Sequence, residues 1–420
     1  MTTTSVLTTA TSLIDQLFPD YVALLQALVR QPSTLGSVRP AQEIVYRHLC
    51  HLGLDAYRQA IEPDTIAGHP DFAPVPWSSQ GEPNVWGVLP ARGSGGRSLV
   101  LNGHIDVVPP GPEDQWTVDP WGAAISQGRL FGRGSMDMKA GLVAALLTMD
   151  AVIASNMPLR GPVIFESVIE EECSGNGMLA QRQQTGPVDG IVILEPTGDT
   201  TWTATPGVLW FEVTVTGKAA YVGQGAASVN AIELAIDLLR RMKPAAVAEL
   251  NAAFSHPAFI GMTNPLTLNV GTIAGGGWPS AVPLTCTTTC RMAFPIDWSF
   301  TQARAFVERH IKQAAADDAW LVAHPPHIRF PGFRAAGWEY RADPALLDLV
   351  DRCHTEETGR RLIRTGWPGT ADGRYADPSV PVVYYGPAGS GIHGPDEYVE
   401  LESMRRVART LVAVIAEWCA

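Results

Sequence analysis

The chain has 420 residues, of which 46% are hydrophobic, and a formal net charge of −12 at pH 7. This length exceeds what one hydrophobic core supports and predicts two domains, and the acidic balance argues against a nucleic-acid partner, which would require clustered Lys and Arg. No apolar run is long enough to span a membrane, and Met1–Leu7 lacks the basic start and continuous apolar stretch of a signal peptide, so we expect no membrane partner and a cytoplasmic location.

Apolar periodicity in the N-terminal half predicts alternating helices and strands. Residues 16–31 and Ala41–Leu52 have the pattern of amphipathic helices, and apolar strands and helices then alternate through Leu194. This order predicts an α/β fold in which helices cover both faces of a mixed, mostly parallel sheet.

The first candidate site residues are His104 and Asp106, which follow an apolar run, Ser98–Leu101, that predicts a buried strand. Positions i and i+2 of a strand share a face. A metal-bound imidazole usually donates its second ring N–H to a carboxylate, so His104 is the candidate ligand and Asp106 its supporting carboxylate. Alone, the His-x-Asp pattern is weak evidence, because a histidine beside a carboxylate in an ordinary turn has the same sequence.

A glycine-punctuated loop, Gly132–Gly141, leads directly into the apolar helix Leu142–Ile153. Asp137 therefore lies at a helix start. A carboxylate there either caps the helix N-terminus or presents its two oxygens to two cations. Considered alone, Asp137 fits the capping role better.

Two further apolar runs end in acidic residues. Residues 163–169 lead into three consecutive glutamates, Glu170–Glu172, and residues 190–194 lead into Glu195. Catalytic groups gather at the carboxyl ends of parallel strands, and a nearby dication would offset the repulsion between adjacent carboxylates. We therefore expect these glutamates to lie at a cation site.

From Gly207 the pattern changes to a β-α-β-β-α order, which predicts a small antiparallel sheet with helices on one face. The expected elements are a strand at 208–217, a helix at Val229–Arg241, strands at Leu266–Ala274 and Val282–Ala293, and a helix at Phe300–Ala315. The chain returns to the first domain near Arg334. We expect residues 1–206 and 333–420 to form one domain, with residues 207–332 as an α+β domain between them.

The C-terminal part adds one more candidate ligand and two helices. His393 lies in a glycine-rich loop after the strand Val382–Tyr385, and helices are expected at Pro344–Thr358 and Glu402–Trp418. The six cysteines are spaced for neither a disulfide framework nor a zinc ribbon, so we expect reduced, mostly buried thiols.

Taken together, these motifs resemble the dinuclear zinc family of acetylornithine deacetylase, succinyl-diaminopimelate desuccinylase, aminoacylases and glutamate-releasing carboxypeptidases. The matching segments occur in family order along nearly the whole chain: Asn102–Pro109, Gly132–Gly141, Glu170–Gly177, Glu195–Thr197, Asn269–Gly271 and His393–Glu397. Several motifs in the same order are far more specific than any one of them.

The resemblance implies a set of roles. Asp137 would bridge two metal ions, His104 and Glu195 would complete one metal site, and Glu172 and His393 would complete the other. Residues 207–332 would be a lid domain inserted into the catalytic domain. This lid would close over the metals and join two chains in a homodimer or a dimer-based oligomer.

Glu171, next to a ligand, would be the catalytic base. Two bound dications would lower the pKa of a water and stabilise an oxyanion, while Glu171 would take the water's proton and pass it to the departing amine. Oxygen ligands with only two imidazoles are compatible with zinc, cobalt or manganese, and the resemblance makes zinc the default.

Two residues depart from the family pattern on the substrate side. Tyr221 stands where the family usually has a histidine that reaches across the dimer to the substrate carbonyl, and Ser280 stands where it usually has asparagine. A phenol can donate a hydrogen bond to an oxyanion but does not become cationic near neutral pH. The alternative is that the ring of Tyr221 only fills space.

Other residues have expected roles in substrate binding or support. By the resemblance, Arg291 stands where relatives bind the substrate's carboxylate, and its planar fork suits that contact; the alternative is a solvated surface charge. Asp372 and Arg374 resemble a segment that supports the site. Trp278 and Trp367, in glycine-rich loops, could stack on an aromatic substrate.

Three functions are compatible with this sequence. The first is metal-dependent removal of an acyl group from an N-acyl amino acid or a similar small molecule with an amide beside a carboxylate. The second uses the same activated water to remove the amine from an amino-substituted aromatic carboxylic acid. The third is a non-catalytic relative, which ranks last because all five ligands and Glu171 are present.

Overall fold

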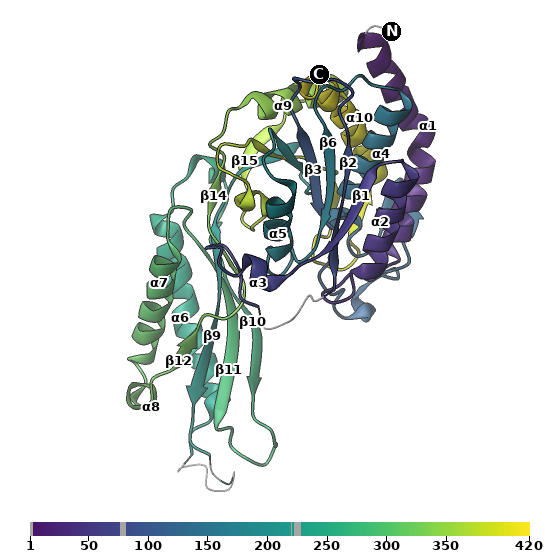
Figure 1. Ribbon diagram of the computed structural model, residues 1–420. Helices are drawn as coiled ribbons and strands as arrows, with labels where there is room; N and C mark the ends of the chain where they lie inside the picture. The colour runs from purple at the N-terminus through teal and green to yellow at the C-terminus, as the bar shows by residue number, and fades with distance from the viewer. Residues whose placement is uncertain (1–2, 76–80, 220, 222–227) are drawn as a thin grey trace.

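The computed structural model of the chain describes residues 3–75, 81–219, 221 and 228–420 (Figure 1). Its described residues form two large hydrophobic cores. One surrounds a six-stranded sheet built from the N-terminal half and the C-terminal segment, and the other lies between a second sheet and two helices from the middle of the chain. The second sheet projects away from the first (Figure 1).

The six-stranded sheet is mixed and has a parallel centre. Its strand order is β1 (Asp55–Ala60), β2 (Pro83–Leu89), β6 (Val163–Val168), β3 (Leu99–His104), β7 (Ile191–Ile193) and β16 (Val382–Tyr384). The last four strands are parallel, whereas β1 and β2 pair antiparallel at one edge. The expected mixed, mostly parallel sheet is therefore confirmed.

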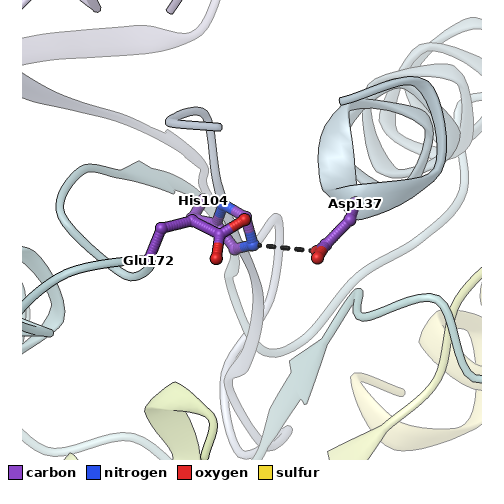
Figure 2. Close-up of side chains that lie close together, drawn as sticks. All are labelled: His104, Asp137 and Glu172. Atoms are coloured by element: carbon purple, nitrogen blue, oxygen red, sulfur yellow. Dashed lines mark hydrogen bonds and ion pairs between the residues drawn. The ribbon is translucent and has the colours of Figure 1, made fainter. Parts of the chain in front are cut away.

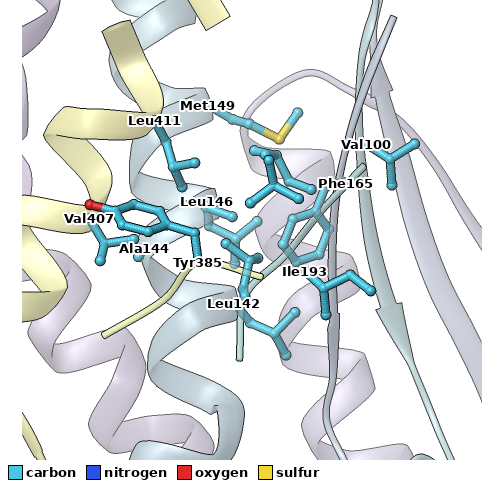
Figure 3. Close-up of a cluster of buried hydrophobic side chains, with 14 of the residues drawn as sticks. Val100, Leu142, Ala144, Leu146, Met149, Phe165, Ile193, Tyr385, Val407 and Leu411 are labelled. Carbon is cyan, nitrogen blue, oxygen red and sulfur yellow. The ribbon is translucent and has the colours of Figure 1, made fainter. Parts of the chain in front are cut away.

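Helix α4 (Ala140–Ala154) packs between this sheet and helices α1 (Thr3–Val29) and α10 (Leu401–Trp418). It is buried along nearly its whole length, which explains why its sequence is apolar on all sides. Figure 3 shows Leu146 and Met149 of α4 in one cluster with Val100 of β3 and Leu411 of α10. The remaining helices of this part are α2 (Arg39–His51), α3 (Pro63–Ile66), α5 (Asn176–Thr185) and α9 (Ala345–Thr358).

The second sheet is antiparallel and is covered on one face by two helices. Its order is β10 (Leu268–Gly275), β11 (Thr285–Phe294), β9 (Gly207–Thr216) and β12 (His327–Arg329), with β13 (Arg334–Ala335) also pairing with β9. Alternate residues of β9, such as Phe211 and Val213, are buried against α6 (Ala231–Ala253) and α7 (Phe300–Ala315). The short α8 (Ala319–Ala323) follows α7.

Two small sheets complete the framework around the strand ends. One has the order β14 (Trp338–Glu339), β8 (Thr200–Thr205) and β15 (Ile363–Gly366), and the other has the order β17 (Gly389–Ser390), β18 (Tyr398–Glu400), β5 (Arg129–Phe131) and β4 (Ile125–Ser126). Single turns occur at Glu113–Gln115, Ser135–Lys139, Pro257–Phe259 and Asp372–Tyr375.

The expected elements are present, but two helices are longer than predicted. Helix α1 begins at Thr3 instead of residue 16, because Val6 and Ala10 continue the buried stripe through a threonine-rich segment of low helix propensity. Helix α6 continues to Ala253 past Pro244, since Ala246 and Leu250 are buried in the same core. The division at residues 206 and 332 stays a prediction.

The contact between α4 and the end of β7 gives a test of the packing. A Cβ atom at Gly141 would lie 2.2 Å from the carbonyl oxygen of Leu194, the residue before Glu195. Alanine normally stabilises a helix relative to glycine, so the overpacking at this contact reverses the expected sign. We expect Gly141→Ala to lower the free energy of unfolding by about 1–3 kcal/mol in urea titrations.

The control for this test is Gly68→Ala, because no atom lies within 4 Å of a Cβ at Gly68. A Gly141→Ala variant as stable as the Gly68→Ala variant would contradict the close packing of α4 on β7.

Candidate metal centre

His104 is the last residue of β3, between the parallel neighbours β6 and β7, and its ring is almost completely buried. Its Nδ1 lies 2.8 Å from the carbonyl oxygen of Asp106, which can only accept a hydrogen bond. Nδ1 therefore carries a proton, and in the neutral ring Nε2, 3.1 Å from Oδ1 of Asp137, is the nitrogen that can bind a cation. Burial lowers the pKa of His104, but its hydrogen bond to Asp137 and the nearby carboxylates raise that pKa well above its usual range.

The carboxylate of Asp106 has a different partner from the one we expected. It lies 3.8 Å from His104 Nδ1 and instead accepts hydrogen bonds from the backbone N–H groups of Glu171 (3.3 Å) and Glu172 (3.1 Å). The backbone carbonyl of Asp106 therefore accepts the hydrogen bond from the imidazole. The Asp106 carboxylate instead holds the acidic turn that follows β6.

Asp137 is held by a buried carboxylate, Glu397, to which the sequence analysis assigned no role. The two oxygens of Glu397 accept hydrogen bonds from the backbone N–H groups of Gly134 (3.1 Å), Met136 (2.9 Å) and Asp137 (3.1 Å). Oε2 also forms an ion pair with the buried guanidinium of Arg133. The loop that carries Asp137 is thus fixed by charge-assisted hydrogen bonds.

The two oxygens of Asp137 face two different imidazoles. Oδ1 lies 3.1 Å from His104 Nε2, and Oδ2 lies 3.3 Å from His393 Nε2. His393 Nε2 is also 3.0 Å from Oε2 of Glu172. Figure 2 shows His104, Asp137 and Glu172 converging from β3, the loop before α4 and the turn after β6.

Glu170 and His393, on either side of this cluster, have left-handed backbone conformations, with φ of 64° and 58°. Such conformations are uncommon for residues other than glycine and persist where the surrounding structure imposes them. They are therefore consistent with loops shaped to present Glu172 and His393 to a shared ligand.

The remaining acidic residues of the cluster fit a divalent-cation site electrostatically. Burial raises the pKa of Glu171, Glu172 and Glu195, and the charge of neighbouring carboxylates raises each of them further. Removing so much like charge from water is costly unless cations accompany it. Two imidazoles with several carboxylates form a donor set that zinc and similar dications accept.

A cavity of about 360 Å³ opens beside these groups. Arg291 on β11 lines it, and burial lowers the pKa of Arg291. No acidic partner for this guanidinium is found within the described parts of the chain. A half-buried guanidinium without a counter-charge is unfavourable, and a carboxylate of an incoming molecule would satisfy it.

The structure does not bring every expected substrate-binding residue to this cavity. Tyr221 is 70% exposed and pairs with Ala281 through an isolated bridge, and Ser280 and Trp278 are exposed in the loop after β10. Of the expected substrate contacts, only Arg291 and Trp367 line the cavity.

Asp372 and Arg374 lie behind the acidic turn. Burial raises the pKa of Asp372 to about 7, although the charge of Arg374 opposes this shift. Arg374 donates hydrogen bonds to the Ala371 carbonyl and the Tyr375 hydroxyl, which lies 3.1 Å from the carbonyl of Ser174. The segment thus connects to the turn that carries Glu171, which is consistent with the supporting role expected for it.

Comparisons with known proteins give one family. The profile described as peptidase family M20/M25/M40 matches residues 100–417. The chain is 30% identical to succinyl-diaminopimelate desuccinylase 2 of Ruegeria sp., covering 80% of this chain and 84% of that protein. It is 26% identical to N-formyl-4-amino-5-aminomethyl-2-methylpyrimidine deformylase of Halalkalibacterium halodurans, covering 97% of this chain and 96% of that protein.

A solved di-peptidase from Saccharomyces cerevisiae has a similar fold. Its TM-score is 0.81 at 15% sequence identity, and the match covers 98% of both chains.

Among the described residues, none of the helices has both the length and the apolar character needed to cross a bilayer.

The buried Glu397 gives a test of how the site is built. In Glu397→Gln, an amide N–H₂ would face backbone N–H donors and leave Arg133 without its counter-charge. We expect the free energy of unfolding to fall by about 3–5 kcal/mol and the affinity for zinc to fall by about 10- to 100-fold. Chemical denaturation and chelator competition would measure these changes.

The control is Glu402→Gln, which removes an exposed ion pair with Arg405 and should change stability by less than about 1 kcal/mol. If both variants bound zinc as the unmodified chain does, Glu397 would not be positioning Asp137.

Proposed function

The chain belongs to peptidase family M20/M25/M40 and is a hydrolase of C–N bonds, and we propose that it removes an acyl group from an N-acyl amino acid or a similar amide that carries a carboxylate. The observation that carries this proposal is the position of Asp137, each of whose oxygens faces a different imidazole. The names of the two relatives support it, since both describe the removal of an acyl group.

We assign the metal ligands from this geometry and the family resemblance. Asp137 would bridge two divalent ions, with His104 and Glu195 completing one site and Glu172 and His393 completing the other. Zinc is the default, with cobalt and manganese as alternatives. Bound in this position, the ions would supply Lewis acidity that activates water and stabilises an oxyanion.

The residues of the chain itself would move the proton. Glu171 lies beside the proposed ligands, with Oε2 4.0 Å from His104 Nε2. Burial and neighbouring carboxylates raise its pKa above the usual range. Glu171 would accept the proton of the attacking water and return it to the departing amine, while Asp106 would hold Glu171 through its backbone N–H.

Arg291 would bind the carboxylate of the substrate. It lines the cavity with Glu171, and a bidentate contact with its guanidinium would orient the amide relative to Glu171. This contact supports a small molecule with a carboxylate as the substrate.

A second candidate reaction is hydrolytic removal of the amine from an amino-substituted aromatic carboxylic acid. The observation that favours it is the aromatic lining of the cavity, which includes Trp202 and Trp367. The two reactions differ in their products. Deacylation of an N-acyl amino acid releases an amino acid, whereas deamination of the aromatic acid releases ammonia.

We further propose that residues 207–332 form a lid through which two copies of the chain associate. Strand β10 is an edge strand with an exposed C-terminal half, and Tyr221, Ile273 and Trp278 are exposed near it. Exposed edges and apolar side chains favour pairing with another chain. Association would also account for the exposed positions of Tyr221 and Ser280 away from the cavity of their own chain, because these residues would complete the cavity of the partner.

A cytoplasmic location is supported by the six cysteines, all of which are free thiols.

Substitutions of the adjacent residues Glu171 and Glu172 distinguish the proposed catalytic base from the proposed metal ligand. We expect Glu171→Gln to keep the zinc content of the unmodified enzyme and to lose about 100- to 10,000-fold in kcat, because the proton acceptor is removed. Glu172→Gln should lose bound zinc instead, as measured by elemental analysis. A Glu171→Gln enzyme with full zinc and full turnover would exclude Glu171 as the base.

Dimerisation and the role of Tyr221 can be tested together. Light scattering should give twice the chain mass of 45.1 kDa. Ile273→Glu should give monomers, whereas Ile260→Glu, at an exposed position elsewhere, should not.

If Tyr221 acts on its partner's cavity, mixing equal amounts of inactive Glu171→Gln and Tyr221→Ala chains should restore about one quarter of the activity. Half of the dimers would then contain one chain of each kind, and one of the two sites in each such dimer would have both Glu171 and the partner's Tyr221. A dimer that gains no activity on mixing would contradict this role of Tyr221.

A further inference from the structure

Four aromatic side chains line the cavity beside the proposed metal ligands: Trp202, Trp210, Phe333 and Trp367. They come from two separate sheets. Trp202 belongs to β8 and Trp367 follows β15, whereas Trp210 belongs to β9 and Phe333 precedes β13. Removing an acyl group from an aliphatic amino acid requires none of them.

Trp202 and Trp367 form one rigid aromatic surface. Their indoles are stacked, with ring centroids 4.5 Å apart and planes inclined by 7°. Tyr384 of the main sheet packs on Trp202 at 5.2 Å, which explains why Trp202 is nearly completely buried while Trp367 is half-buried. A Cβ at Gly369 would lie 2.4 Å from Trp367 Nε1, so glycine allows the neighbouring loop to lie against this indole.

Trp210 is presented by the face of the second sheet that α6 and α7 leave uncovered. Its neighbours in β9 are buried under those helices, and alternation along the strand directs Trp210 to the opposite face. Phe333 packs against it edge to face, with ring centroids 5.9 Å apart. Across the sheet, Trp210 is in register with Arg291 on the antiparallel strand β11.

This register places a guanidinium and an indole side by side at the same cavity. A guanidinium fork matches a carboxylate, and an indole face matches a planar ring. An aliphatic amide would use Arg291 but would place no ring against the cavity-facing surfaces of these indoles. Each favourable ring–ring contact strengthens binding by roughly two- to tenfold.

We propose that this cavity selects amides that bear an aromatic or heteroaromatic ring, with the ring held against the indoles of Trp210 and Trp367 and the carboxylate held by Arg291. The inference rests on the proposed function, because it names the substrate class of the same site. It assigns Trp210 and Trp367 as specificity-determining residues.

Turnover of matched substrate pairs tests the proposal. 4-Formamidobenzoate and 4-formamidobutanoate share a formamide and a carboxylate and differ in the ring, and benzoylglycine and butyrylglycine share the leaving amine. With the zinc-loaded enzyme, we expect kcat/KM for the ring-bearing member to exceed that of its partner at least about tenfold in one pair or both.

Substitutions at the two indoles separate ring recognition from intrinsic reactivity. Because a ring also changes the reactivity of the amide, the diagnostic quantity is the aromatic-to-aliphatic ratio of kcat/KM. Trp210→Leu and Trp367→Leu should lower this ratio at least about fivefold, whereas Trp367→Phe, which keeps a ring, should preserve most of it.

Trp320→Leu is the matched control. Trp320 stacks on His324 and donates a hydrogen bond to the Thr216 carbonyl, and it does not line the cavity. Its replacement should leave the ratio unchanged. Thermal unfolding of all variants would show that each one is folded.

Binding of the products gives a readout that does not depend on turnover. By calorimetry, 4-aminobenzoate should bind the zinc-loaded enzyme at least about tenfold more tightly than 4-aminobutanoate, and Trp210→Leu and Trp367→Leu should reduce this preference.

The outcomes separate the two proposals. Hydrolysis of both members of each pair at similar rates, or a ratio unchanged in both leucine variants, would overturn ring selection and leave the proposed deacylation intact. If no amide is hydrolysed, the proposed function fails. In that case, tight binding of 4-aminobenzoate that depends on the indoles would still support ring selection. Equal affinity for 4-aminobenzoate and 4-aminobutanoate would overturn it.

Discussion

The structure depends on one electrostatic constraint, the concentration of carboxylates in a buried volume at the ends of parallel strands. Asp137, Glu171, Glu172 and Glu195 raise one another's electrostatic energy, as the raised pKa values of the three glutamates show. Two imidazoles from distant parts of the chain converge on the same volume. Such an arrangement is stable only with compensating positive charge, and divalent cations supply it compactly.

The protein positions these groups by holding the backbone of the loops that carry them. The Asp106 carboxylate accepts the N–H groups of Glu171 and Glu172, and the Glu397 carboxylate accepts those of Met136 and Asp137. Each supporting carboxylate thus fixes a loop without competing for the cation. Since both are buried, their hydrogen bonds are stronger than equivalent ones in water.

The cavity combines contributions from two hydrophobic cores. The first provides the carboxylates and imidazoles, together with the stacked pair Trp202 and Trp367. The sheet of the second core provides Trp210 and Arg291 on the face that the helices leave uncovered. The contacts of Trp210 and Arg291 can therefore change without altering the groups at the ends of the parallel strands, because they belong to a different sheet.

The sequence by itself determined the fold class, the family and the candidate ligands, because strand periodicity and short motifs are local properties that survive in one dimension. It also predicted Arg291 and Trp367 at the cavity. Only the tertiary structure decided that Glu397 holds Asp137, that the Asp106 carboxylate holds the acidic turn, and that Trp202 and Trp210 reach the cavity. Each of these contacts joins residues far apart in the chain, or depends on which face of a strand is left uncovered, and neither property leaves a local pattern.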